Sequence, residues 1–244
     1  MSGSPVGGAT APGDVARRYD EIRERVDGAA RGAGRDPGDV LIVGASKTVD
    51  LDRIRVALDA GLRDLGENRA QELVAKAPEL AGAGTDAPRW HFLGQLQRNK
   101  VRAVAPYVGL WQSVDRGELG AEIARRAPGA RVLVEVNLAA EPQKAGCEPA
   151  AVPALVDLLR SDGLDVRGLM AVPPASGDPR PWFAALRSLG QELQLPELSM
   201  GMSADYEAAV SEGATIVRIG RALFGDRPPP GVATAPVARP PSVG

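Results

Sequence analysis

The chain is poor in the residues that build disulfides, metal sites and catalytic triads. Among its 244 residues there is one cysteine, Cys147, and one histidine, His91. A single cysteine excludes a disulfide framework within the chain and favours a reducing compartment, so we expect a cytoplasmic protein. These two residues supply neither the usual ligands of a metal site nor the partners for Ser-His-Asp or Cys-His catalysis. We interpret His91 as a core or supporting residue.

Long apolar runs and an excess of one charge are also missing. The absence of any run of about 18 apolar residues excludes a membrane-spanning helix. Residues 1–13 lack the basic and apolar regions of a signal peptide. The 29 lysines and arginines nearly balance the 31 aspartates and glutamates, leaving a net charge of -2. This balance argues against binding to nucleic acids through a strongly basic surface.

Short apolar runs alternate with amphipathic stretches through the middle of the chain. The apolar runs, which predict strands, cover 41–46, 64–67, 91–94, 110–113, 132–137, 168–172, 198–202 and 216–219. The amphipathic stretches, which predict helices, cover 51–60, 69–80, 97–105, 117–126, 151–160, 182–193 and 204–212. Repeated βα units predict an α/β fold with a parallel sheet. Eight such strands at regular spacing favour a closed (β/α)8 barrel of the TIM type over an open, doubly wound sheet.

The two ends of the chain differ from this alternating region. A charged stretch from Asp14, the expected N-cap, to about Ala33 predicts an extra N-terminal helix that covers one end of the barrel. Residues 1–12 and 227–244 are rich in glycine, proline and alanine and can bury little surface, so we expect disordered tails. The organisation predicted is therefore a single barrel domain at 13–226.

Two of the strand ends combine small residues with hydrogen-bond donors. The segments 198–203 (LSMGMS) and 215–221 (TIVRIGR) each end where a helix is expected to begin. Ser203 is the expected N-cap of the following helix, with a hydroxyl free to bind backbone or ligand. Gly220 allows close approach, and the backbone N–H groups of Gly220 and Arg221 would point at an anion. These features predict a site for a phosphate monoester.

Three further polar residues lie at predicted strand ends. Lys47 follows a buried apolar run, where partial desolvation would favour its neutral, nucleophilic amine. Asn68 comes directly after the second strand. Arg218 lies near the end of the last strand and either pairs with a carboxylate or donates to a ring nitrogen. A lysine combined with a phosphate site indicates a phosphorylated aldehyde held as a Schiff base.

With these residues the chain resembles the pyridoxal phosphate homeostasis proteins, single-domain relatives of the alanine racemase barrel. The matching segments, between about residues 14 and 226, are ASKT at 45–48, GEN at 66–68, WHFLGQLQRNK at 90–100, SVD at 113–115, VN at 136–137, KAG at 144–146, GLMAVP at 168–173, LSMGMS at 198–203, VRIG at 217–220 and FG at 224–225. The resemblance implies the fold type III class of cofactor-binding barrel and pyridoxal 5'-phosphate (PLP) as the cofactor. It further implies a non-catalytic role in PLP buffering or delivery, with PLP-dependent apo-enzymes as recipients, and we expect a monomer.

The resemblance also assigns roles to single positions. The residues matched to the cofactor pocket are Lys47, Asn68, Ser203, Arg218, Gly220 and Arg221. Lys47 resembles the lysine that links covalently to PLP, and Ser203 with the backbone of 220–221 resembles the phosphate binders. Asn68 resembles a residue that lines the pocket. Arg218 resembles the arginine that faces the pyridine nitrogen, where it keeps that nitrogen unprotonated and weakens the cofactor as an electron sink.

An enzyme is the alternative to a carrier. It would be an amino-acid racemase acting with residues of a partner, or a Schiff-base aldolase in which Lys47 attacks a sugar phosphate. Alanine racemases carry a second, β-rich domain that supplies a catalytic tyrosine, and we expect this chain to lack that domain. None of its own tyrosines, Tyr19, Tyr107 and Tyr206, lies at a predicted strand end. The expectation is therefore PLP binding without racemase catalysis.

Overall fold

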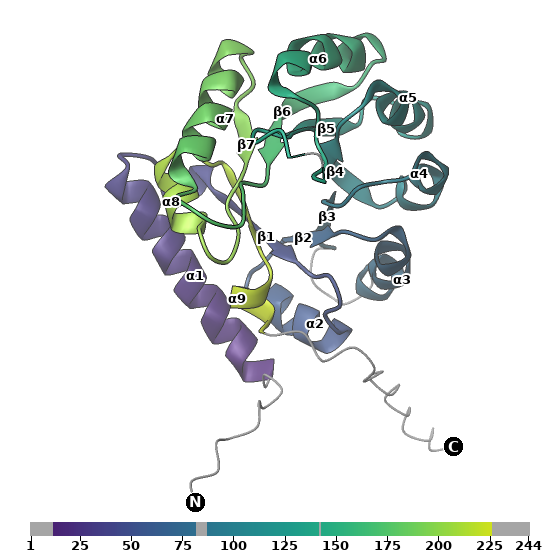
Figure 1. Cartoon of the computed structure of the whole chain (residues 1–244). Coiled ribbons are helices and arrows are strands. Elements are labelled where there is room, and N and C mark those ends of the chain that lie inside the picture. The colour runs from purple at the N-terminus through teal and green to yellow at the C-terminus, as the bar shows by residue number, and fades with distance from the viewer. Residues whose placement is uncertain (1–11, 82–86, 142, 226–244) are drawn as a thin grey trace, which may run out of the picture.

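The computed structural model describes residues 12–81, 87–141 and 143–225. Its centre is a closed barrel of eight parallel strands in sequential order, and β1 pairs with both β2 and β8 (Figure 1). The predicted (β/α)8 barrel is confirmed. The expected tails at 1–12 and 227–244 lie outside the described residues, except for Pro12, which begins the first helix.

Each expected strand is present, with shifts of a few residues at some ends. The strands are β1 (Leu41–Ala45), β2 (Asp64–Glu67), β3 (Arg89–Phe92), β4 (Val108–Val114), β5 (Arg131–Val136), β6 (Asp165–Ala171), β7 (Glu197–Ser199) and β8 (Ile216–Ile219). The β6 strand begins three residues before the expected 168, and β7 ends at Ser199 although the apolar run predicts a strand to 202. Gly201 adopts φ +90°, a left-handed conformation that turns the chain out of the extended state.

Helices follow the strands around the outside of the barrel (Figure 1). They are α1 (Pro12–Gly32), α2 (Leu51–Asp59), α3 (Ala70–Leu80), α4 (Arg98–Val104), α5 (Gly117–Arg126), α6 (Val152–Ser161), α7 (Arg180–Glu192), α8 (Tyr206–Ser211) and α9 (Arg221–Phe224), with short 3-10 turns at Pro37–Asp39 and Pro149–Ala151. No helix in the described ranges is long and apolar enough to cross a membrane.

The extra N-terminal helix is present, but two expectations about it are wrong. It begins at Pro12, so Asp14 lies in its first turn and is not the N-cap. It also packs along α2, α8 and α9 on the outside of the barrel, where the last βα unit meets the first (Figure 1). The buried side chains of Val15, Ile22 and Val26 make this contact favourable. The helix therefore closes the seam of the outer layer and not an end of the barrel.

Two apolar layers, one inside and one outside the strands, hold the barrel together. In β1, Val43 packs in the interior cluster, with Leu41 and Ala45 against it, while Ile42 belongs to the outer cluster under the helices. This alternation is the ordinary period of two residues in a strand. The interior cluster is small, consisting of Val43, Leu93, Leu110, Leu133, Met170 and Ile216. The remainder of the interior is available for the buried polar side chains described below.

Candidate functional site

The register of three neighbouring strands brings Lys47, Asn68 and Gly220 to the same end of the barrel. Ala45 of β1 pairs with Gly66 of β2, so Lys47 and Asn68 each come two residues after a paired position. On the other side, β1 pairs with β8 up to Ile219, the residue before Gly220. A Cβ atom built on Gly220 would lie 3.4 Å from the carbonyl oxygen of Ala45. The structure thus brings together these three predicted site residues.

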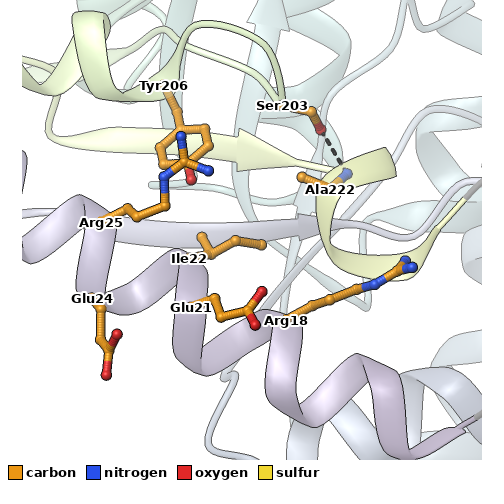
Figure 2. Close-up of a pocket in the computed structure, with 8 residues that line it drawn as sticks. All are labelled: Arg18, Glu21, Ile22, Glu24, Arg25, Ser203, Tyr206 and Ala222. Atoms are coloured by element: carbon orange, nitrogen blue, oxygen red, sulfur yellow. Dashed lines mark hydrogen bonds between the residues drawn. The ribbon is translucent and has the colours of Figure 1, made fainter.

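Ser203 joins this group from the loop between β7 and α8. Its Oγ accepts a hydrogen bond of 3.1 Å from the backbone N–H of Ala222, in the first turn of α9 (Figure 2). The expectation that Ser203 caps the next helix is wrong, because α8 begins at Tyr206 with Asp205 as its N-cap. A turn in which Asp205 Oδ1 accepts from Met202 N–H delays the helix. Ser203 therefore lies beside the Gly220–Arg221 backbone, with its own hydroxyl proton free to donate.

A hollow of about 310 Å³ adjoins this serine on the side facing α1 (Figure 2). Ser203 and Ala222 line it together with Arg18 and Arg25 of α1 and Tyr206 of α8. The Arg25 guanidinium carbon stands 5.6 Å from the centre of the Tyr206 ring, which is a cation–π contact. Burial raises the pKa of Tyr206, and its hydroxyl has no hydrogen-bond partner in the described part of the chain.

Asn68 lines a second hollow, of about 480 Å³, at the ends of β2 and β3. The charged side chains of its wall are Arg69, Lys100 and Arg116, and no carboxylate belongs to it. A Cβ atom built on Gly94 would lie 2.3 Å from the carbonyl oxygen of Asn68, so this close approach of the two loops requires glycine at position 94.

Arg218 is buried inside the barrel, with 5% of its surface exposed. Its guanidinium donates to Ser199 Oγ at 2.6 Å and to the carbonyl oxygen of Ala171 at 3.0 Å. Of the two roles that the sequence leaves open, a direct ion pair is not formed with any residue that the structure describes. Burial lowers the pKa of Arg218 to about 10, while the nearby carboxyl of Glu135 raises it. A buried cation held only by neutral acceptors is suited to face a polar ligand.

A chain of hydrogen bonds continues from Ser199 across the interior. Ser199 Oγ donates to Gln112 Oε1 at 2.6 Å, and Gln112 Nε2 lies 2.7 Å from His91 Nδ1. Because that amide nitrogen is a donor, Nδ1 accepts, and the proton of His91 lies on Nε2, 3.0 Å from Asp64 Oδ1. Burial raises the pKa of Asp64, but hydrogen bonds from Arg89 and His91 outweigh this and leave the pKa lowered. The role expected for His91, a core or supporting residue, is confirmed.

Two titratable groups near these hydrogen-bonded side chains were not among the candidates from the sequence. Glu135 of β5 is 9% exposed, and its Oε2 is buried without a partner in the described part of the chain. Burial raises the pKa of Glu135 to about 7, and the charge of Asp115 adds to this effect. Burial likewise raises the pKa of Cys147 to about 11, so this thiol is a weak nucleophile at neutral pH. The only sequence signal for Glu135 was its alternation with Leu133, which belongs to the interior cluster.

Metal ligands do not gather anywhere in the described ranges. No group of three or more histidine, cysteine, aspartate or glutamate side chains there is placed to hold a metal ion. The chemistry of the strand ends is instead that of a lysine, a serine hydroxyl, a glycine-containing turn and a buried arginine. Such groups can bind an anion and present an amine to a carbonyl compound.

Comparison with known proteins identifies the family. Residues 20–228 match the family described as "Alanine racemase, N-terminal domain". A relative in Aquifex aeolicus named pyridoxal phosphate homeostasis protein is 42% identical, over 88% of this chain and 99% of the relative. One in Pseudomonas aeruginosa with the same name is also 42% identical, over 87% and 96%. PipY of Synechococcus elongatus, solved with PLP bound, has a TM-score of 0.76 and 34% identity over 86% of this chain and all of that one. The chain belongs to the family of pyridoxal phosphate homeostasis proteins.

Proposed function

We propose that this protein binds PLP in the cytoplasm, holds it reversibly and passes it to PLP-dependent apo-enzymes, without catalysing a reaction of its own. The residues proposed to hold the cofactor are Lys47, Asn68, Ser203, Arg218, Gly220 and Arg221. The observation that carries the proposal is the convergence of a lysine, a serine and a glycine turn at the joined ends of β1, β7 and β8. We further propose that the carrier acts as a monomer.

The residues fit the groups of PLP. Ser203 accepts a backbone N–H from α9 and keeps its hydroxyl proton for a phosphate oxygen, beside the backbone N–H groups of Gly220 and Arg221. Lys47 supplies the amine, and Arg218 supplies an N–H donor to the ring nitrogen. When bound, the cofactor supplies an aldehyde that captures primary amines and a ring that withdraws electrons. A guanidinium donor leaves the ring nitrogen without a proton and makes that withdrawal weak, which favours a carrier.

The tyrosines are placed unfavourably for racemisation, which needs an acid and a base on opposite faces of the cofactor. Tyr107 precedes β4, at the opposite end of the barrel from the site, and Tyr19 lies on α1. Tyr206 lies on α8 with its hydroxyl buried. One observation favours racemisation as a second function: in the described part of the chain the Oε2 atom of Glu135 is buried without a partner, and burial raises the pKa of this carboxyl to about 7. Its carboxyl could hold or release a proton at neutral pH.

A turnover assay decides between the two functions. We expect the protein loaded with PLP to leave single enantiomers of alanine and other amino acids unchanged, and to activate an added PLP-dependent apo-enzyme. Chirality is followed by circular dichroism or by derivatisation and chromatography. Racemisation at about one turnover per second or faster, an ordinary enzymatic rate, would overturn the carrier proposal if Lys47→Ala abolished it. Its loss in Glu135→Gln would identify the second proton carrier.

Ser203→Ala should separate phosphate binding from the capture of the aldehyde. The variant removes one hydroxyl donor to a dianion, a bond worth roughly 1.5–3 kcal/mol, so PLP binding should weaken about ten- to a hundredfold. Pyridoxal, which has no phosphate, should bind almost as it does to the unmodified protein. Fluorescence titration with both ligands measures the difference. Ser211→Ala, in which the lost hydroxyl donates to the carbonyl of Glu207 on α8, is the matched control. Equal losses for both ligands would assign Ser203 a purely structural role.

A further inference from the structure

The backbone on both sides of Lys47 is bonded to charged side chains of α3. The carbonyl oxygen of Ser46 accepts a hydrogen bond of 2.7 Å from Lys76 Nζ. On the other side, the backbone N–H of Thr48 donates to Glu72 Oε2, also at 2.7 Å. The two bonds therefore enclose the one residue between them, Lys47.

The two side chains that make these bonds are themselves tied together. Lys76 Nζ lies 3.1 Å from Glu72 Oε2, one helical turn away, and 2.7 Å from Glu67 Oε1. With the carbonyl of Ser46 these acceptors use all three N–H donors of the ammonium group. Glu67 is fully buried at the end of β2 and also accepts a hydrogen bond of 2.8 Å from Ser46 Oγ. The three hydrogen bonds therefore fix the position of the Lys76 ammonium group.

The loop that contains Lys47 is also held in an unusual conformation. Thr48 adopts φ +62°, in the left-handed region that residues other than glycine seldom occupy. Its hydroxyl donates to the carbonyl oxygen of Lys47 at 2.6 Å, and its N–H is the group that Glu72 accepts. A conformation of this kind persists where the surrounding bonds impose it, and such sites are often functional. Of these two bonds of Thr48, the bond to Glu72 comes from outside the loop.

We propose that Glu72 and Lys76 are positioning residues for Lys47: together they form a clamp that fixes its backbone so that its amine meets the aldehyde of PLP. The inference rests on the proposed function and adds to it two residues that bond the backbone on either side of Lys47. A flexible loop would place the amine near the aldehyde only part of the time, and misplacement by about 1 Å can cost up to about a hundredfold in rate. Burial raises the pKa of Glu67, and the ammonium of Lys76 acts against it.

A positioning role can be told apart from a general contribution to stability. If the clamp only stabilised the fold, its loss would weaken every ligand of the site to the same degree. If it positions Lys47, its loss slows covalent capture and leaves binding through phosphate and ring intact. The compound 4'-deoxypyridoxine 5'-phosphate has the phosphate and the ring but no aldehyde, so it reports the second kind of binding alone.

The experiment compares Glu72→Ala, Glu72→Gln and Glu79→Ala in the full chain. Glu79 is an exposed glutamate of the same helix and serves as the matched control. The rate of PLP attachment to Lys47 is measured by borohydride quenching and peptide mass spectrometry, and analogue affinity by titration. We expect Glu72→Ala to slow attachment about tenfold or more and to change analogue affinity less than about twofold. Glu72→Gln keeps an oxygen for the Thr48 N–H and should recover most of the rate, while Glu79→Ala should behave as the unmodified protein does.

Hydrogen exchange of the peptide containing residues 46–49, in the ligand-free protein, provides a second readout. It should accelerate in Glu72→Ala and in the double variant Lys76→Met/Glu67→Gln, which removes the ammonium without leaving a buried carboxylate uncompensated. If these variants attach PLP and exchange hydrogen as fast as the unmodified protein does, the proposed clamp is refuted and the proposed function is not affected. If the variants bind PLP and the analogue more weakly to the same degree, Glu72 and Lys76 have only a structural role and the positioning proposal is refuted. Failure of the unmodified protein to attach PLP at all would instead refute the proposed function, and the positioning role with it.

Discussion

Lys47→Ala should abolish the covalent attachment of PLP. The purified, PLP-loaded protein should absorb near the blue edge of the visible range, and borohydride should fix the cofactor on the peptide that contains Lys47. The variant should lose both signals, because the ammonium of Lys76, which lies beside the same loop, is held by Glu67 and Glu72. We expect residual binding through phosphate and ring, since Ser203 and the α9 turn are unchanged. Absorbance spectra and mass spectrometry of the reduced protein provide the measurement.

Two other lysines test whether this result is specific. Lys100 lies in the basic hollow beside Asn68, and Lys144 donates to the carbonyl oxygen of Pro173 at 3.0 Å. Lys100→Ala and Lys144→Ala should keep the yellow colour and the label on Lys47. A label found on either of these lysines in the unmodified protein would refute the assignment of Lys47.

Glu135→Gln should stabilise the ligand-free protein in a manner that depends on pH. Burial raises the pKa of this carboxyl from an ordinary value of 4.5 to about 7 in the folded protein. The folded protein therefore binds more protons than the unfolded chain between these two values, and the free energy of unfolding falls as pH rises through that window. The full effect, reached above about pH 7, is up to about 3 kcal/mol. The glutamine amide does not ionise in this pH range, so the free energy of unfolding of the variant should not fall in the same way.

Denaturant unfolding at several pH values measures the effect. We expect the two proteins to have similar free energies of unfolding well below pH 4.5, where the carboxyl is protonated in both states, and to diverge as the pH rises toward 8. Glu79→Gln, on the exposed side of α3, should follow the unmodified protein at every pH. A constant gain at all pH values would mean that Glu135→Gln acts through packing or hydrogen bonding and not through ionisation.

The barrel could be predicted from the sequence because each βα unit has its own local pattern of apolar and polar residues. Val43 and Ile42 alternate between inside and outside, and an amphipathic stretch follows each of the first seven apolar runs. This repetition is a property of neighbouring residues, so it is visible without knowledge of any long-range contact. A strand boundary differs from the periodic pattern where a single residue changes the backbone conformation. At β7, the left-handed Gly201 ends the strand earlier than the apolar run suggests.

Most of the candidate site could be located for a related reason. In a parallel barrel all strands end on the same face, so Lys47, Asn68 and Gly220 had to be neighbours once the strands were placed in order. The role of Ser203 was only partly accessible. Its approach to α9 was expected, but its assignment as a helix cap was wrong, because whether α8 begins at 204 or at Tyr206 depends on a turn closed by Asp205.

What the sequence by itself determined is therefore the number and order of the strands and the kinds of residues at their ends. The tertiary structure alone decided which side chains meet across the barrel. In the sequence Glu72 and Lys76 have the spacing of an ordinary ion pair on a helix surface, and their bonds to the loop of Lys47 form only when α3 packs against β2 and α2. The unpartnered Glu135 is likewise a consequence of burial among distant strands. Contacts of this kind join residues far apart in the chain, and local periodicity carries no information about them.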